Sequence, residues 1–195
     1  MRKFVLGFVT GIVVLLLAVF CYVRFGFVDP RADKEVSLLE SKIAMPALDA
    51  AVDRRASEAQ NPIQPTDANL TAGMKVYQRN CASCHGDIQR PRASLADTLY
   101  PRAPQFLEDA PDMPEKQNFY IIQHGVRMSG MPAWKQVLSE QEIWQVTTFL
   151  NHMDKLPPQV SDLWKAAASG SPDANSSPDT NKMQMKDKKG MKMPM

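Results

Sequence analysis

The sequence predicts a mainly α-helical protein, with an N-terminal transmembrane helix followed by a small domain of about three main helices. Three observations predict this architecture. Residues 4–23 carry no charged side chain. Apolar residues recur at helical spacing from Leu70 to Cys81. Farther along, Ser139 and Glu142 have the spacing of a helix-capping box. We divide the chain into a transmembrane signal-anchor (1–28), a stalk (29–66), the helical domain (67–160) and a disordered tail (161–195).

The uncharged N-terminal segment is long enough to cross a membrane. At about 1.5 Å per residue, a helix over residues 4–23 spans roughly 30 Å, the thickness of the hydrocarbon core. Arg2 and Lys3 precede it, so the positive-inside rule places the N-terminus in the cytoplasm. We therefore expect a single-pass protein of the bacterial inner membrane, with lipid around residues 4–23 and the domain on the periplasmic side. A cleaved signal peptide is the alternative, but the bulky residues from Cys21 to Phe25 do not resemble a cleavage site.

The stalk is polar and contains several prolines. Pro46 and the alanine-rich residues after it predict a short helix that extends to Gln60. We interpret this segment as a stalk between the membrane and the domain, with docking on the domain surface as the alternative.

The motif Cys81-Ala82-Ser83-Cys84-His85 determines the expected chemistry. Two thiols three positions apart, followed at once by an imidazole, form the attachment motif for c-type haem. We expect Cys81 and Cys84 to form thioether bonds with one haem c, and His85 to bind its iron. A structural zinc site needs four ligands, usually in two close pairs, and the three cysteines of the chain do not supply them. A thioredoxin-like dithiol would follow a strand, whereas a helix over 70–80 leads into this motif.

Two more helices are expected after the motif. Asp112 and Glu115 predict the capped start of a helix that runs to Gly125, and Gly86 is expected to end the first helix. The capping box at Ser139 predicts a third helix, and the pair Pro157-Pro158 is expected to close the domain.

A haem iron bound by His85 has a second axial position, and the residues alone leave several candidates for it. Met128 and Met131 lie in one loop, with His124 just before it. Pro132 favours Met131, because a rigid neighbour fixes the loop that presents the ligand.

Residues 67–156 resemble the monohaem class I cytochromes c. The shared features are a first helix that leads into Cys-x-x-Cys-His, a loop with the pair Met131-Pro132, and a last helix rich in aromatic residues. The resemblance implies that Met131 is the distal iron ligand. It also implies that Gly73 and Tyr77 pack against the last helix, with Trp144 as their partner.

Two further expectations concern the surroundings of the haem. The ring N–H of His85 should donate to a backbone carbonyl in the loop 90–104, which fixes the tautomer. Three arginines of that region are candidates for ion pairs with haem propionates, or else are solvated surface charges: Arg90, Arg92 and Arg102.

The expected function is one-electron transfer in a respiratory-type chain, with other redox proteins as partners. An iron with histidine and methionine ligands has no open position for a substrate, and methionine raises its reduction potential. We therefore expect an electron carrier and not an enzyme. The alternatives are the cytochrome subunit of a larger membrane oxidoreductase, or a haem sensor or peroxidase if the distal methionine dissociates. The net charge of +2 gives no indication of nucleic-acid binding.

The C-terminal tail has an unusual composition. Residues 181–195 contain five methionines and five lysines. The simplest interpretation is a solvated segment without a ligand. Cu(I) binding is the alternative, because thioethers are soft ligands.

Overall fold

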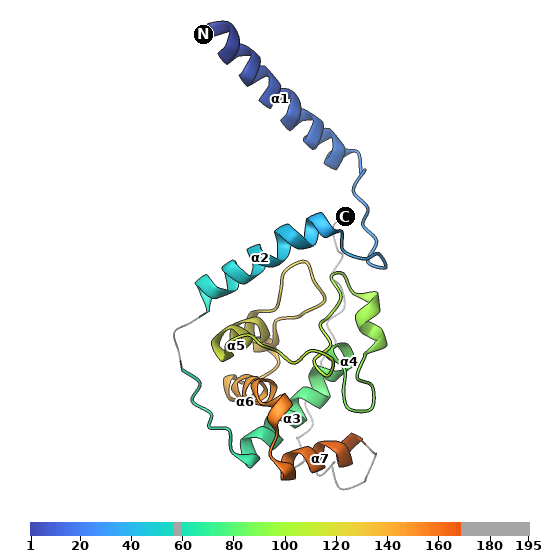
Figure 1. The fold of residues 1–195 in the computed structure, drawn as a ribbon, viewed down its shortest axis with the longest axis vertical. Helices are drawn as coiled ribbons and strands as arrows, with labels where there is room; N and C mark the ends of the chain where they lie inside the picture. The colour runs from blue at the N-terminus through green and yellow to red at the C-terminus, as the bar shows by residue number, and fades with distance from the viewer. Residues whose placement is uncertain (57–59, 169–195) are drawn as a thin grey trace, which may run out of the picture.

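The computed structural model describes residues 1–56 and 60–168, and these residues form helices joined by loops, with no strand among them (Figure 1). The domain is built from α3 (Asp67–Asn80), α4 (Ala82–His85), α5 (Glu115–His124) and α6 (Glu140–Asn151). Two helices precede it and one follows it: α1 (Arg2–Arg24), α2 (Leu38–Arg55) and α7 (Pro158–Ala168). Three short 3₁₀ helices lie in the connections: η1 (Ser94–Thr98), η2 (Trp134–Gln136) and η3 (Met153–Lys155). The predicted mainly α fold is confirmed.

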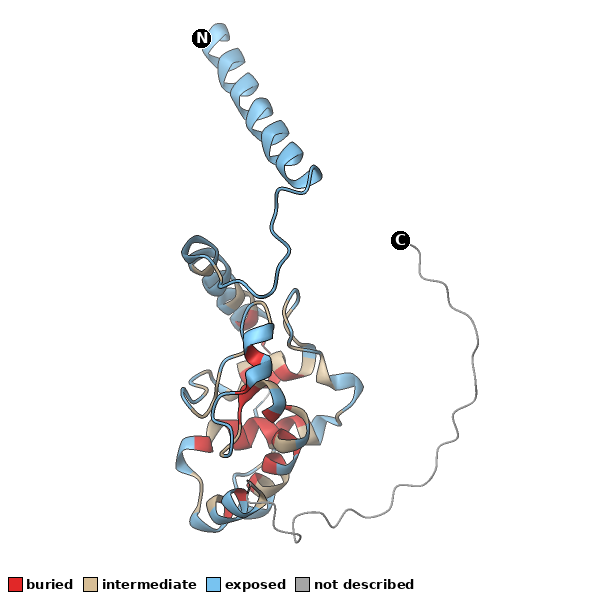
Figure 2. Cartoon of the chain, turned by 90° about the vertical axis from the view of Figure 1, so that its right-hand side faces the viewer, coloured by how far each residue is buried: buried red, intermediate tan, exposed pale blue. Residues whose placement is uncertain are grey.

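Helix α1 extends away from the rest of the molecule (Figures 1 and 2). It has 23 residues and a mean hydropathy of 2.9 over its most apolar window, and none of that window is buried. An isolated apolar helix of this length is suited to cross a membrane. In length and composition, α1 therefore fits the predicted single-pass membrane anchor.

The domain core lies where α3 crosses α6, and a glycine makes this crossing close. A Cβ atom on Gly73 would collide with the backbone oxygen of Gln145 and lie 2.8 Å from the Cβ of Phe149. Tyr77, one turn farther along α3, is fully buried, with its ring centroid 5.6 Å from that of Phe149. The partners on α6 are thus Gln145 and Phe149. The expected partner, Trp144, instead stacks on Phe119 of α5 with ring centroids 3.8 Å apart.

Side-chain caps are present at the starts of α6 and α3, but the cap expected for α5 is absent. Ser139 and Glu142 form the predicted capping box at the start of α6. Thr66 caps α3 through its side chain, which accepts from the N–H of Asn69 at 3.3 Å. The expected cap of α5 by Asp112 is not formed: α5 begins at Glu115, directly after Pro114, and no side chain caps it.

The stalk contains a longer helix than the sequence predicted. Helix α2 begins at Leu38, eight residues before Pro46, because the hydroxyl of Ser37 accepts from the N–H of Glu40 at 3.2 Å and so caps the first turn. Pro46 lies inside the helix. Of the two alternatives for this segment, docking is the one found. Val52 is buried, and the phenol of Tyr100 donates to Glu40 at 2.5 Å.

The domain extends beyond the predicted end at residue 160. Helix α7 starts with Pro158 in its first position, where proline favours a helix. Val160 and Trp164, four residues apart on one face, are both buried. The indole ring of Trp164 meets the ring of Phe149 edge-on, with centroids 5.1 Å apart. Residues 161–168 therefore belong to the domain and not to a disordered tail. The methionine-rich tail lies outside the described residues.

Candidate haem-binding site

The Cys-x-x-Cys-His motif forms a single helical turn at the end of α3. Cys81 is both the C-cap of α3 and the N-cap of α4, and its carbonyl accepts from the N–H groups of Cys84 and His85, each at 3.0 Å. Gly86 ends the turn with a φ of +85°, which a residue with a side chain rarely adopts. A Cβ there would also press on the backbone of Pro91. The two thiols and the imidazole are therefore presented by one rigid turn.

The state of the two thiols fits covalent attachment better than the rival chemistries. Both cysteines are free, with no disulfide between them. Burial, with a smaller effect from Cys84, raises the pKa of Cys81 to about 12. Reactive thiols have a lowered pKa, so Cys81 does not resemble the reactive thiol of a redox pair. In the described part of the chain, no group of three or more His, Cys, Asp or Glu side chains is placed to hold a metal ion.

The ring of His85 is held in one orientation. It is 9 % exposed, and its Nδ1 lies 2.9 Å from the carbonyl oxygen of Pro104. Because a carbonyl oxygen only accepts, Nδ1 carries the proton and Nε2 keeps a lone pair that is suited to bind a metal. The ring also stacks on Phe106, with centroids 4.4 Å apart and planes 1° apart. The predicted carbonyl in the loop 90–104 is confirmed as that of Pro104.

Burial also keeps this imidazole in the form that an iron ligand needs. It lowers the pKa of His85, and the hydrogen bond to Pro104 opposes that effect only in part. A neutral imidazole is the form that coordinates a metal. The side chains present thus fit a c-type haem: two free thiols at the required spacing, followed by a neutral, oriented imidazole.

Gln105 supports the motif, and the sequence analysis did not identify it. Its side-chain amide donates to the carbonyl of Cys84 at 2.9 Å and to that of Ala103 at 2.8 Å. Its side-chain oxygen accepts from the N–H of Ala93 at 2.7 Å. The side chain of Gln105 therefore links Cys84 to Ala93 and to Ala103 in the loop that follows the motif. The one signal in the sequence is its position directly after Pro104.

The loop between α5 and α6 is closed by its own hydrogen bonds. The N–H of Val126 donates to the carbonyl of Met131 at 3.1 Å. The hydroxyl of Ser129 donates to the carbonyl of Val126 at 2.7 Å and accepts from the N–H of Met131 at 3.1 Å. Gly125 allows this closure, because its φ is +68° and a Cβ would lie 2.7 Å from the Met131 oxygen. The role of Ser129 was also missed by the sequence analysis.

The two methionines of this loop have different surroundings. Met128 is 90 % exposed and has a positive φ of 59°. Met131 is partly buried and packs against the hydrophobic cluster that contains Cys81 and Ala82. Phe106, which stacks on His85, packs against the same cluster. The structure therefore packs Met131 against the hydrophobic core to which Cys81 and Ala82 belong, and leaves Met128 exposed.

The three arginines form ion pairs on the surface. Arg90 pairs with Asp87 at 3.8 Å, and Arg92 with Asp97 at 3.2 Å. Arg102 joins the same Asp97 at 3.6 Å. Their side chains are 41–73 % exposed, which agrees with the interpretation as surface charges.

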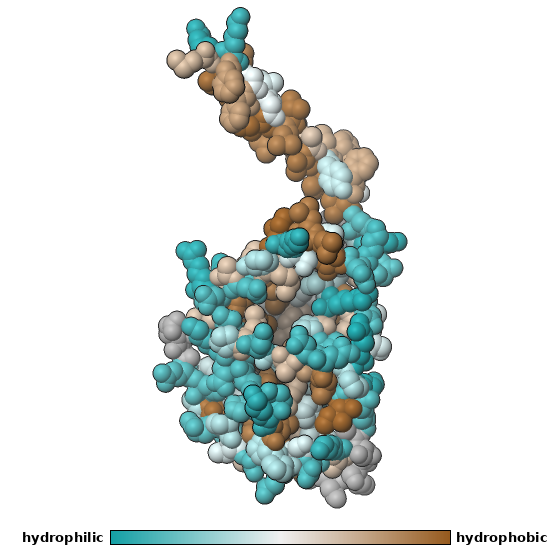
Figure 3. Space-filling view, in the orientation of Figure 1, coloured by the Kyte–Doolittle hydropathy of each residue, from teal (hydrophilic) through white to brown (hydrophobic). Residues whose placement is uncertain are grey.

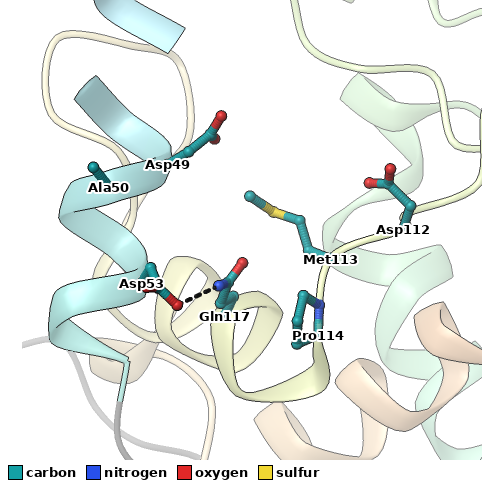
Figure 4. Close-up of a pocket in the computed structure, with 7 residues that line it drawn as sticks. All are labelled: Asp49, Ala50, Asp53, Asp112, Met113, Pro114 and Gln117. Carbon is teal, nitrogen blue, oxygen red and sulfur yellow. Dashed lines mark hydrogen bonds between the residues drawn. The ribbon is translucent and has the colours of Figure 1, made fainter. Parts of the chain in front are cut away.

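The groove drawn in Figure 4 is separate from the motif. It lies between α2 and the start of α5, has a volume of about 460 Å³, and is lined by residues of those two segments. The amide of Gln117 donates to Asp53 across it at 3.0 Å. Its lining includes three aspartates and neither a cysteine nor a histidine: Asp49, Ala50, Asp53, Asp112, Met113, Pro114 and Gln117.

A comparison with known protein families agrees with this geometry. Residues 68–150 match the family described as cytochrome C oxidase, cbb3-type, subunit III. The matched segment runs from the start of α3 almost to the end of α6, and it contains the motif and the methionine loop. The similarity of this segment to an oxidase cytochrome subunit points to a covalently bound haem c and to haem-based electron transfer. Over residues 68–150, the chain is thus similar to the monohaem cytochromes c.

Proposed function

We propose that the protein is a membrane-anchored one-electron carrier with a single haem c. In this proposal Cys81 and Cys84 hold the haem by thioether bonds, and His85 and Met131 are the axial ligands of its iron. The observation that carries the ligand assignment is the contrast between the two methionines, because Met131 packs on the core beside the motif and Met128 is 90 % exposed.

The side chains at this site are suited to electron transfer. When bound, the haem supplies a one-electron couple whose potential is raised by a methionine ligand. His85 is fixed by Pro104 and Phe106, and the loop of Met131 is closed by Ser129. Ligands held in this way change little between two oxidation states. Two protein ligands also leave no axial position for a substrate.

The site of action follows from α1. Arg2 and Lys3 precede the apolar helix, and the positive-inside rule keeps that end in the cytoplasm. The haem domain then lies on the periplasmic side of a bacterial inner membrane, where other redox proteins exchange electrons with it. Protease added to intact spheroplasts should cleave the domain and leave α1 in the membrane. Recovery of a soluble form that starts beyond Val28 would instead show a cleaved signal.

A second candidate function is that of a cytochrome subunit in a larger membrane oxidoreductase. The description of the matched family as an oxidase subunit favours it. Solubilisation of native membranes in mild detergent, followed by size-exclusion chromatography, distinguishes the two. A free carrier elutes as a small particle, whereas a subunit co-elutes with other redox proteins at stoichiometric amounts.

Carbon monoxide tests the electron-carrier proposal against a sensor or a peroxidase. If Met131 occupies the sixth position, carbon monoxide should leave the visible spectrum of the reduced protein unchanged at neutral pH. If a complex forms at a low concentration of carbon monoxide, the distal methionine dissociates from the iron. This result would favour the sensor or peroxidase alternative. The Met131→Ala variant is the positive control, because its sixth position is open.

A further inference from the structure

Helix α2 has apolar side chains on two opposite faces. On the face toward the domain, Val52 is 3 % exposed and Leu48 is half-buried. On the other face, residues spaced by four and three positions form one stripe, all of them exposed: Leu39, Ile43 and Pro46. Leu39 and Ile43 expose 72 % and 63 % of their surface. We call these three residues the outer stripe of α2.

The outer stripe belongs to a helix fixed on the domain. Tyr100 donates to Glu40 at the start of α2, and Gln117 donates to Asp53 near its end. Both views of the ribbon place α2 at the end of the domain nearest α1 (Figures 1 and 2). Figure 3 shows hydrophobic surface at this end, directly below α1. The outer stripe therefore lies on the side of the domain from which the membrane anchor emerges.

The chain between the two helices stays apolar beyond the end of α1. Phe25, Phe27 and Val28 are 71 %, 67 % and 52 % exposed. The ring of Tyr22 stacks on that of Phe27, with centroids 5.8 Å apart. Aromatic residues at the end of a membrane helix mark the interface between lipid and water. The surface of the bilayer is therefore expected at residues 22–28, ten residues before α2 begins.

We propose that the outer stripe of α2 rests on the lipid of the bilayer that α1 crosses, in its interfacial region. Leu39 and Ile43 enter the boundary between headgroups and acyl chains, and the exposed Lys42 between them faces anionic headgroups. The contact makes the haem domain a body of fixed orientation, with α2 against the membrane and α7 away from it. This inference depends on the proposed membrane anchoring by α1.

The test uses the full-length haem protein in liposomes that contain anionic lipid. All labels are placed in a Cys21→Ser background, in which Cys81 and Cys84 are taken up by the haem. A nitroxide label at Val13→Cys, in the middle of α1, serves as the reference for lipid. The other labels are placed at Leu39→Cys, at Ile43→Cys and, as matched control, at Leu163→Cys. Leu163 is a leucine on α7 that is 50 % exposed. Collision rates with oxygen, which enters lipid, and with a water-soluble nickel chelate are measured by electron paramagnetic resonance.

The labels at positions 39 and 43 should collide mainly with oxygen, giving a ratio between those of the Val13→Cys label and the Leu163→Cys label. A ratio equal to that of Leu163→Cys, with position 13 in lipid, would overturn the proposal and leave the anchoring intact. Protection of position 39 from both reagents would also overturn it, because a protein would then cover the stripe. Water exposure at position 13 itself would refute the anchoring by α1. The visible spectrum of each variant checks that it is loaded with haem.

Discussion

The Nδ1 of His85 donates to the carbonyl of Pro104 at 2.9 Å, across a separation of nineteen residues. The intervening loop is therefore part of the haem site, although none of its residues is expected to touch the iron. The carbonyl of His85 in turn accepts from the N–H of Phe106 at 3.1 Å, and the Phe106 ring stacks on the imidazole. Residues 104–106 thus hold the proposed iron ligand, His85, from two sides.

Replacement of Gln105 should weaken this support without loss of the iron ligands. The Gln105→Leu variant loses two donated hydrogen bonds and one accepted bond, and it leaves the N–H of Ala93 and the carbonyl of Cys84 without this partner. Unsatisfied buried groups cost about 1–3 kcal/mol. We expect a loss of this size in the free energy of unfolding, measured by guanidinium titration of the haem protein. The matched control is Gln117→Leu, which loses one exposed hydrogen bond and should change stability far less. Equal losses would show that Gln105 is not a special support.

The Gly73→Ala substitution should force α3 and α6 apart. The added methyl group meets the backbone of Gln145 and the Cβ of Phe149, neither of which has room to move. Overpacking in a core costs about 1–3 kcal/mol or more, so we expect a marked fall in melting temperature. Gly130→Ala is the control, because its methyl group meets only the flexible side chain of Leu99. If both variants have the same melting temperature, the close crossing of α3 and α6 is not a determinant of stability.

Ser129→Ala should loosen the loop of Met131. The variant loses the hydroxyl that joins Val126 to the N–H of Met131. We expect the thioether-to-iron absorption of the oxidised protein to disappear at a lower temperature than in the wild type, before the protein unfolds. Paired scans of this absorption and of far-ultraviolet circular dichroism measure the two events. The control is Ser83→Ala, on the exposed surface of α4. It should leave the temperature difference between loss of the absorption and unfolding as it is in the wild type. If Ser129→Ala also leaves this temperature difference unchanged, the hydroxyl of Ser129 does not hold the loop of Met131.

The capping box of α6 should give stability a defined dependence on pH. The N–H of Ser139, and then its hydroxyl, hold the pKa of Glu142 below its usual 4.5. The folded state therefore favours the carboxylate, whose stabilisation is complete above pH 4.5 and is lost as the pH falls through the lower folded value. The Glu142→Gln variant should be less stable than the wild type at neutral pH by about 0.3–1 kcal/mol. That difference should vanish in acid. Glu140→Gln is the control from the same helical turn, and an equal pH effect there would refute the special role of the capping box.

Much of the fold was predictable where the signals are local. The capping box at Ser139 needs only four residues, and it was predicted correctly from the sequence. The motif at Cys81 needs five residues, and its assignment to haem attachment stays a prediction. The helix before the motif was also predicted, because its apolar spacing matches its buried face. The carbonyl partner of His85 was placed in the correct loop because the ligand chemistry requires such a partner.

The errors lie where tertiary packing decides. The start of α2 depends on the cap by Ser37, and its docking depends on Val52 and Tyr100, which are distant in sequence. Helix α7 was missed because a proline pair indicates an end as readily as a start, and only the burial of Trp164 against α3 and α6 decides between them. Tyr77 packs on Phe149 and not on Trp144, the partner that was expected. Which of the two faces α3 depends on the rotation of α6 about its axis, and no local sequence pattern determines that rotation.

The ligation of iron by His85 and Met131 is the central claim, and the optical spectrum of two variants tests it most directly. Oxidised Met131→Ala should lose the thioether-to-iron charge-transfer absorption, and its reduction potential should fall, because the thioether that favours the reduced iron is gone. Oxidised Met128→Ala should keep both the absorption and the potential, since that side chain is 90 % exposed. Loss of the absorption in Met128→Ala with its retention in Met131→Ala would contradict the account, and no effect in either variant would show that the iron is not ligated by methionine from this loop.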